Sequence, residues 1–381
     1  MDFQLSEERA AIRDMARSFA MEQIAPHALD WDRDRHFPLD VLKQAAELGL
    51  GGMMVAEAQG GSGLGRLDSV LVYEALAEGC PAISAYLSIH NMVGTMIDRH
   101  GSDAQKADYL PRLCAGEIWA SYCLTEPGSG SDAAALQTRA EREGNDYILT
   151  GQKMFISGAG ATDLYVVMAR TGGPGPKGIS AFLIDKGAEG LTFGANEKKM
   201  GWNAQPTRTV QMDRVRLPAT AMLGPEGAGF RLAMEALDGG RTSISACSLG
   251  GAQAALDKAL AYTAERRAFG QSLNNFQALQ FALAEMATDL EVSRTFLWRA
   301  AAALDAKSPE ATRLCAMAKK HVTDAGFEVA NRALQLHGGY GYLADYGVEK
   351  IVRDLRVHQI LEGTNEIMRL IIARQLIDGG R

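Results

Sequence analysis

The sequence predicts an α+β fold in three parts, in the order helices, strands, helices. Apolar residues recur at helical spacing up to about residue 120, short β-rich runs follow to about residue 223, and long helical stripes return from residue 227. With 381 residues, 47% of them hydrophobic, the chain can bury more than one core. We therefore expect domains at residues 1–120, 121–226 and 227–381.

The first part is predicted to be helical. Ile12, Met15 and Phe19 recur at intervals of three and four residues, which places them on one face of a helix. The glycine-rich segment at residues 57–65 is too rich in glycine for a helix and is expected to form an ordered turn.

The middle part is predicted to be an antiparallel sheet, either a sandwich or a barrel. Its runs of β-branched and aromatic residues are short and are separated by Gly, Pro, Asn and Asp. No helical segment between them is long enough for a crossover between parallel strands. The clearest expected strands lie at residues 147–149, 154–156, 164–168, 179–184 and 207–215.

The last part is again predicted to be helical. One stripe consists of Leu279, Leu283, Met286 and Leu290. Another helix is expected to begin with Ser308 as N-cap and Pro309 in its first turn, and to end at the two glycines 338–339.

Composition excludes several classes of function. A net charge of −7 and a pI near 5.6 argue against nucleic-acid binding. No apolar run reaches membrane-spanning length, and the acidic N-terminus lacks a targeting pattern, which favours a bacterial-type cytoplasmic protein.

The five cysteines have no metal-ligand spacing and are expected to be reduced and mostly buried, so no metal site is predicted. The one GxGxxG match, at residues 173–178, contains two prolines and precedes a strand, so we interpret it as a loop.

Glu362 is a candidate general base. It follows apolar Ile360 and Leu361 and precedes Thr364, a credible N-cap of the next helix. Burial would raise the pKa of its carboxyl, whereas the positive end of the helix would lower it. Taken alone, a solvated or capping glutamate is the commoner role for such a residue.

Other polar residues have two interpretations each. The hydroxyl- and glycine-rich turn at residues 122–132 could bring backbone N–H groups to a ligand or be a plain surface turn. Arg241 and the Arg266–Phe269 segment could hold a ligand or form salt bridges at helix ends. His337 and His358 are interpreted as hydrogen-bonded structural residues.

Five motifs in order along the chain decide among these alternatives. They are YCLTEPGSGSD (122–132), GQKMFIS (151–157), RRAFG (266–270), QLHGGYG (335–341) and EGT (362–364). Together they closely resemble the acyl-CoA dehydrogenases. The resemblance covers nearly the whole chain and implies a C-terminal four-helix bundle, FAD near a subunit boundary, and a homotetramer built as a dimer of dimers.

The resemblance also implies site residues. Those expected to line FAD or flank its ring are Tyr122, Cys123, Leu124, Thr125, Gly130, Ser131, Phe155, Ile156 and Ser157. Those expected to contact the FAD of a neighbouring subunit are Arg266, Phe269, Phe276, Gln277, Gln335, Gly338 and Gly339, with Thr364 and Glu366 at its nucleotide part. Phe155 stands where many relatives carry tryptophan, and Ser157 where many carry threonine. Substrate would be bound by Ser131, Asp238, Gly239, Gly240, Arg241 and, near the CoA end, Arg374.

The implied reaction is α,β-dehydrogenation of an acyl-CoA. Glu362 would remove the α proton, the β hydrogen would leave as hydride to flavin N5, and electron-transfer flavoprotein would reoxidise the flavin. The family places its base at either of two positions, and the other one here is Gly240.

Segments 201–207, 237–241 and 358–368 are similar to the isobutyryl-CoA dehydrogenase branch, which forms methacrylyl-CoA in valine catabolism. The Gly239–Gly240 pair is interpreted as room for a branch at the α carbon. Butyryl-CoA and 2-methylbutyryl-CoA are the alternative substrates. A peroxide-forming oxidase and a non-catalytic scaffold with this fold are the less favoured functions.

Overall fold

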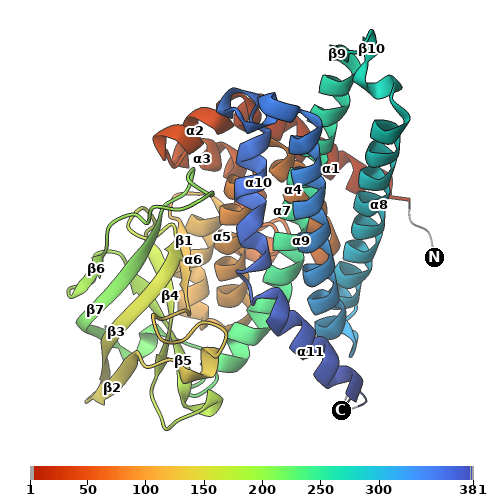
Figure 1. The fold of residues 1–381 in the computed structure, drawn as a ribbon. Helices are drawn as coiled ribbons and strands as arrows, with labels where there is room; N and C mark the ends of the chain where they lie inside the picture. Colours follow the sequence, from red (N-terminus) through yellow and green to blue (C-terminus); the bar gives the residue numbers. More distant parts are fainter. Residues whose placement is uncertain (1–3, 378, 380–381) are drawn as a thin grey trace.

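The computed structural model describes residues 4–377 and 379 and confirms the order of helices, strands and helices (Figure 1). The N-terminal part consists of helices that pack on one another and on the long helix α7. Its principal elements are α1 (Glu7–Phe19), a π-helical turn (Ala20–Ile24), α2 (Ala28–Asp34), α3 (Leu39–Glu47), α4 (Arg66–Gly79), α5 (Pro81–His100) and α6 (Asp103–Cys114).

The middle part is an eight-stranded sheet. Its strands are β1 (Ala120–Cys123), β2 (Arg139–Glu143), β3 (Asp146–Ser157), β4 (Leu164–Arg170), β5 (Ile179–Asp185), β6 (Leu191–Phe193), β7 (Thr207–Pro218) and β8 (Met222–Leu223). The order is β6-β7-β3-β2-β4-β5-β8, with β1 paired to β4. The loop at residues 173–178 ends in a short 3-10 turn before β5, as predicted.

The prediction of a purely antiparallel sheet is wrong at two pairings. β1 runs parallel to β4 from Ala120 opposite Leu164 to Cys123 opposite Val167, and β2 also meets β4 in a parallel pair. A parallel pair needs a long connection rather than a helix as such. Between β1 and β4 that connection is supplied by the β2–β3 hairpin, so the sheet is mixed without a helical crossover.

The C-terminal part is built around α7. Its elements are α7 (Gly229–Glu265), the short strands β9 (Arg267–Ala268) and β10 (Gln271–Ser272), α8 (Gln277–Asp305), α9 (Ala311–Leu336), α10 (Val348–Arg356) and α11 (Asn365–Ile377). The prediction of Ser308 as N-cap and Pro309 in the first turn is wrong by two residues: α9 begins at Ala311 with Glu310 as its N-cap. The Ser308 hydroxyl instead accepts the Glu310 N–H at 3.3 Å, and its carbonyl accepts the Ala311 N–H.

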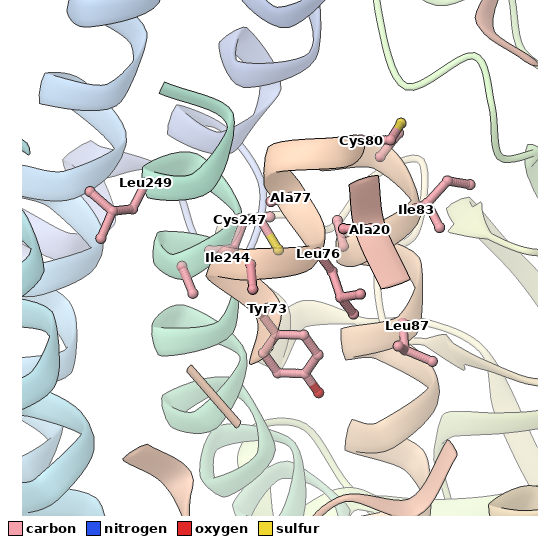
Figure 2. Close-up of a cluster of buried hydrophobic side chains, with 14 of the residues drawn as sticks. Ala20, Tyr73, Leu76, Ala77, Cys80, Ile83, Leu87, Ile244, Cys247 and Leu249 are labelled. Carbon is pink, nitrogen blue, oxygen red and sulfur yellow. The ribbon is translucent and has the colours of Figure 1, made fainter. Parts of the chain in front are cut away.

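Helix α7 crosses between the N-terminal helices and the bundle of α8 and α9 (Figure 1). A side chain at Gly250 would collide with the carbonyl oxygen of Glu74, so glycine allows α4 and α7 to approach closely. Around this contact, Tyr73 and Leu76 of α4 pack with Ile244 of α7 in one buried cluster (Figure 2). The first and third parts therefore share a core, which fixes α7 relative to α4 and α5.

All five cysteines are free and buried, as predicted. Among residues 4–377 and 379, no helix is long and apolar enough to cross a membrane. In the same described part of the chain, no three His, Cys, Asp or Glu side chains come together as a potential metal site.

Candidate active site

Glu362 lies on the connection between α10 and α11 in a left-handed backbone conformation. Its φ is +57° and that of Gly363 is +88°, so two successive residues leave the helical region before α11 begins. Non-glycine residues adopt such φ values rarely and are held there by their surroundings. The surroundings of Glu362 therefore determine where its carboxylate points.

Two buried side chains hold this connection from either side. Before Glu362, His358 accepts a hydrogen bond from the Trp202 indole at 3.1 Å and contacts the Ser248 hydroxyl at 2.6 Å. After it, the Lys319 ammonium donates to the Gly363 carbonyl at 2.8 Å and to Asn365 Oδ1 at 2.9 Å. Burial lowers the pKa of His358 to about 3, so it acts as a neutral structural residue, as predicted. His337 likewise bonds the Ala333 carbonyl at 2.7 Å.

The Glu362 carboxylate is directed at Gly240 of α7. A Cβ atom at Gly240 would lie 2.5 Å from Glu362 Oε2, and one at Gly239 would lie 2.5 Å from Arg66 Nη2. The predicted room at the glycine pair exists, but two charged side chains occupy it in this structure. In this structure the glycines accommodate Glu362 and Arg66. The interpretation of the pair as space for an α branch stays a prediction.

Glu362 Oε2 is buried and has no hydrogen-bond partner among the described residues. Burial raises the pKa of Glu362 from 4.5 to about 7, although Arg241 and Lys319 act in the opposite direction. Desolvation thus outweighs two nearby cations. A buried, unpartnered carboxyl that ionises near neutral pH matches the requirement for a general base.

Arg241 lies near this carboxylate and forms a salt bridge with Asp238. Arg241 Nη1 is 2.5 Å from Asp238 Oδ1, whose second oxygen accepts from Thr312 at 2.7 Å. Arg241 Nε is buried and has no hydrogen-bond partner within the described part of the chain. The pair lies inside α7, not at a helix end, and its role in substrate binding stays a prediction.

Tyr122, on strand β1, lies close enough to Glu362 to be affected by its charge. Its hydroxyl is buried and has no hydrogen-bond partner among residues 4–377 and 379. Burial, and after it the charge of Glu362, raises the pKa of Tyr122 well above the usual value. The flanking Leu124 and Thr125 are half-buried, whereas the Cys123 side chain faces the core of the middle domain. Any ligand contact of Cys123 would therefore come from its backbone.

Glu126 and Lys153 shape the turn that follows. The buried Glu126 carboxylate accepts from the backbone of Gln137 at 2.5 Å and Thr138 at 2.9 Å, and pairs with Lys153 Nζ at 2.8 Å. Gly130 and Ser131 remain exposed, and a Cβ at Gly130 would have nothing within 4 Å. The turn thus presents an open, ordered backbone, which fits a ligand site better than a collapsed loop.

Phe155 stands out from β3 because of a bulge. The pairing of β3 with β7 shifts register between Lys153 and Ile156, and Phe155 within that interval has φ +60° and is 60% exposed. Ile156 points into the core, and the Ser157 hydroxyl accepts from Gln205 at 3.3 Å. An aromatic face is therefore held outward beside the turn at Tyr122, as a flat ring system would require.

A second group of predicted residues lies at the other end of the bundle (Figure 1). Gln335 is sixteen residues beyond Lys319 on α9, about 24 Å at 1.5 Å per residue. A cavity of about 390 Å³ there is lined by Arg266, Gln335, Gly338 and Gly339. Phe269 is 95% exposed and touches Phe276, and Gln277 begins α8. Within one chain these residues are not brought to Glu362.

Three further predicted residues lie on α11 or at its start. Thr364 caps the helix as predicted, since its hydroxyl accepts from the Ile367 N–H at 3.3 Å. Glu366 in the first turn pairs with Arg369 at 2.7 Å. Arg374 is exposed on the last turn.

The sequence reasoning missed Lys319 and Arg66. Lys319 had a signal, because it lies on the stripe of Cys315 and Val322 that α9 buries, where lysine is rare. Arg66 follows a glycine-rich turn, and nothing in its spacing marks it.

The comparisons with known proteins agree over the whole chain. Models of the acyl-CoA dehydrogenase N-terminal, middle and C-terminal domains match residues 6–117, 121–215 and 227–377. The mitochondrial isobutyryl-CoA dehydrogenases of Bos taurus and Dictyostelium discoideum are each 52% identical over 373 residues, or 98% of this chain and 90% of theirs.

The chain belongs to the acyl-CoA dehydrogenase family. Its fold agrees: butyryl-CoA dehydrogenase from Megasphaera elsdenii has a TM-score of 0.96 at 35% identity, covering 99% of this chain and 100% of that one. This acyl-CoA dehydrogenase is therefore an oxidoreductase.

The raised pKa of Glu362 predicts a pH-dependent stability cost. A carboxyl whose pKa is higher in the folded state destabilises that state wherever it is ionised, so the cost is absent below about pH 4.5 and complete above about pH 7. Glu362→Gln should therefore gain up to about 3 kcal/mol of unfolding free energy at pH 8 and little at pH 5.

Urea unfolding of the flavin-loaded protein at the two pH values measures this gain. Glu285→Gln, which removes a 69% exposed carboxyl, is the matched control and should show no such difference. Equal stability changes for Glu362→Gln at both pH values would contradict the assigned burial cost.

Proposed function

We propose that this enzyme converts isobutyryl-CoA to methacrylyl-CoA, with Glu362 removing the α proton. The observation that carries the proposal is the buried, unpartnered Glu362 carboxylate whose pKa is raised to about 7. The 52% identity to isobutyryl-CoA dehydrogenases supports the substrate. Such a reaction belongs to valine catabolism.

The chain's own residues supply the proton chemistry. The thioester makes the α hydrogen acidic, and the Glu362 carboxylate accepts it without first losing a hydrogen-bond partner, because Oε2 has none. The protonated carboxyl that results suits its buried site, since burial favours the neutral form. Lys319 and His358 keep the connection in place while the charge changes.

FAD is the cofactor of this acyl-CoA dehydrogenase. The outward Phe155 ring, the open backbone at Gly130 and the half-buried Tyr122, Leu124 and Thr125 fit a flavin. The distal cavity would serve the flavin of a neighbouring subunit. When bound, FAD supplies at N5 the acceptor for the β hydrogen. We assign the sequence-predicted contacts to it on this basis.

A second copy of the chain would complete the flavin site. Arg266, Phe269 and Gln335 lie too far from Glu362 to share a flavin with it in one subunit, whereas a neighbour could bring its own copies to that flavin. We propose a homotetramer arranged as a dimer of dimers. Light scattering on a size-exclusion column should give about four times 40.9 kDa, and a stable monomer that retains flavin would contradict the shared site.

Electron-transfer flavoprotein is the proposed electron acceptor, because the resemblance to the acyl-CoA dehydrogenases implies it. A cytoplasmic location stays a prediction.

Anaerobic titration with isobutyryl-CoA tests the proposed activity. The oxidised flavin absorbance should bleach, and kcat/KM with a flavoprotein acceptor should be higher for isobutyryl-CoA than for butyryl-CoA or 2-methylbutyryl-CoA. Because one methylene is worth only about 10- to 200-fold, the two alternatives are expected to react slowly rather than not at all. A clear preference for butyryl-CoA would overturn the substrate assignment but leave the family chemistry intact.

A further inference from the structure

A small cavity opens beside Gly240, between α4, α5 and α7. It is lined by Arg66 at the start of α4, by Met92 and Met96 of α5, and by Leu232 and Gly240 of α7. Its volume is about 20 Å³, roughly the space of one water molecule. Because Gly240 also touches the Glu362 carboxylate, an acyl chain held against Glu362 would extend toward this cavity.

Arg66 places a guanidinium on the wall of this cavity. Its Nη2 approaches Gly239 so closely that a Cβ there would lie 2.5 Å away, and its Nη1 is 3.5 Å from the Ser243 hydroxyl. Burial lowers the pKa of Arg66. The wall is therefore polar at this point. Met92, Met96 and Leu232 are apolar, and the remaining lining includes the polar side chains of Thr95, Arg99, His100 and Glu235.

The carboxylates around Arg66 are engaged elsewhere. Asp305 accepts from the backbone N–H groups of Arg66 at 2.7 Å and Leu67 at 3.1 Å, where it caps α4. Asp238 pairs with Arg241, and Glu235 pairs with Arg99 at 3.1 Å. Among the described residues, no carboxylate forms a salt bridge with the Arg66 guanidinium.

We propose that Arg66 determines specificity by excluding acyl chains longer than the short branched group, an inference that rests on the proposed function. Arg66 is partly buried, and a charge removed from water without a counter-ion is tolerable only while its N–H groups keep water or polar neighbours. A longer apolar acyl chain would displace those partners from the guanidinium and could not replace their hydrogen bonds. Extension is therefore opposed by desolvation of the guanidinium as well as by the size of the cavity.

Removing the charge tests this role. Arg66→Met keeps a long side chain without the guanidinium, and the ratio of kcat/KM for hexanoyl-CoA to that for isobutyryl-CoA should rise about tenfold or more relative to wild type. Arg66→Lys should keep the wild-type ratio because it keeps a cation on the cavity wall. Arg66→Gln, a neutral variant that can still bond Ser243, should raise the ratio and serves if Arg66→Met does not fold.

Arg9→Met is the matched control. Arg9 pairs with Asp68 at 2.7 Å near the start of α4 and does not line the cavity, so its loss should leave the ratio unchanged. An unchanged ratio in folded, flavin-loaded Arg66→Met and Arg66→Gln would overturn the proposal. So would faster wild-type turnover of glutaryl-CoA than of isobutyryl-CoA that disappears in Arg66→Met, since Arg66 would then bind a carboxylate.

Failure of the proposed role of Arg66 can be distinguished from failure of the proposed function. If wild-type protein does not bleach with isobutyryl-CoA at all, the function itself is wrong. If it bleaches and the neutral Arg66 variants retain the wild-type chain-length preference, only the role of Arg66 is wrong.

Discussion

Glu362→Gln should slow flavin reduction by isobutyryl-CoA by about 10²- to 10⁴-fold, the usual contribution of a positioned general base. The amide has nearly the shape of the carboxyl but cannot accept the α proton. Because the variant keeps the side chain against Gly240, thioester binding should change little. Stopped-flow absorbance at the flavin band under anaerobic conditions measures the rate, and the substrate dependence of the amplitude measures binding.

Glu366→Gln is a fitting comparison for this experiment, since it makes the same chemical change four residues further on at an exposed carboxyl. It is expected to affect flavin retention more than the rate of bleaching. Normal bleaching in Glu362→Gln would remove Glu362 from the role of base.

Gly240→Ala should lower the rate of flavin reduction by about a hundredfold. The added Cβ would lie 2.5 Å from Glu362 Oε2 and 2.9 Å from Cδ, so the carboxylate must move. A misplacement of about 1 Å at a reacting group is enough for a loss of that size. Unlike Glu362→Gln, this variant keeps the ionisable group and should still show a pH-dependent rate.

Gly187→Ala is the matched control, because a Cβ there has nothing within 4 Å and no positive φ to oppose it. It should bleach at the wild-type rate. If the flavin of Gly240→Ala were also reduced at that rate, the contact between Gly240 and the base would not be needed for the reaction.

Much of the fold could be predicted from periodicity, and the places where prediction failed have physical causes. Helical spacing of apolar residues correctly predicted the helical first and last parts, and short β-rich runs predicted the middle sheet. The parallel pairing of β1 with β4 was missed because a hairpin, not a helix, supplies the long connection, and local sequence does not report which distant strand is the neighbour.

Only part of the candidate site could be predicted from the sequence, for a related reason. Glu362 and the turn at Tyr122 lie in compact motifs, so the resemblance could assign them together. Lys319 and Arg66 act from elements far away in sequence, and only the packing of α9 and α4 on the Glu362 connection and on α7 reveals them. The glycines at 239 and 240 correctly predicted that another group packs closely against α7. They did not predict that this group would be the side chains of Arg66 and Glu362.

The pH dependence of flavin reduction in the wild-type enzyme tests the central claim most directly. If the Glu362 carboxylate is the base, the anaerobic rate with isobutyryl-CoA should rise with pH as this group ionises near pH 7 and level off above about pH 8. The residual rate of Glu362→Gln should lack that rise. A wild-type rate that is flat from pH 5.5 to 8.5, or a rise that persists in Glu362→Gln, would contradict the assignment.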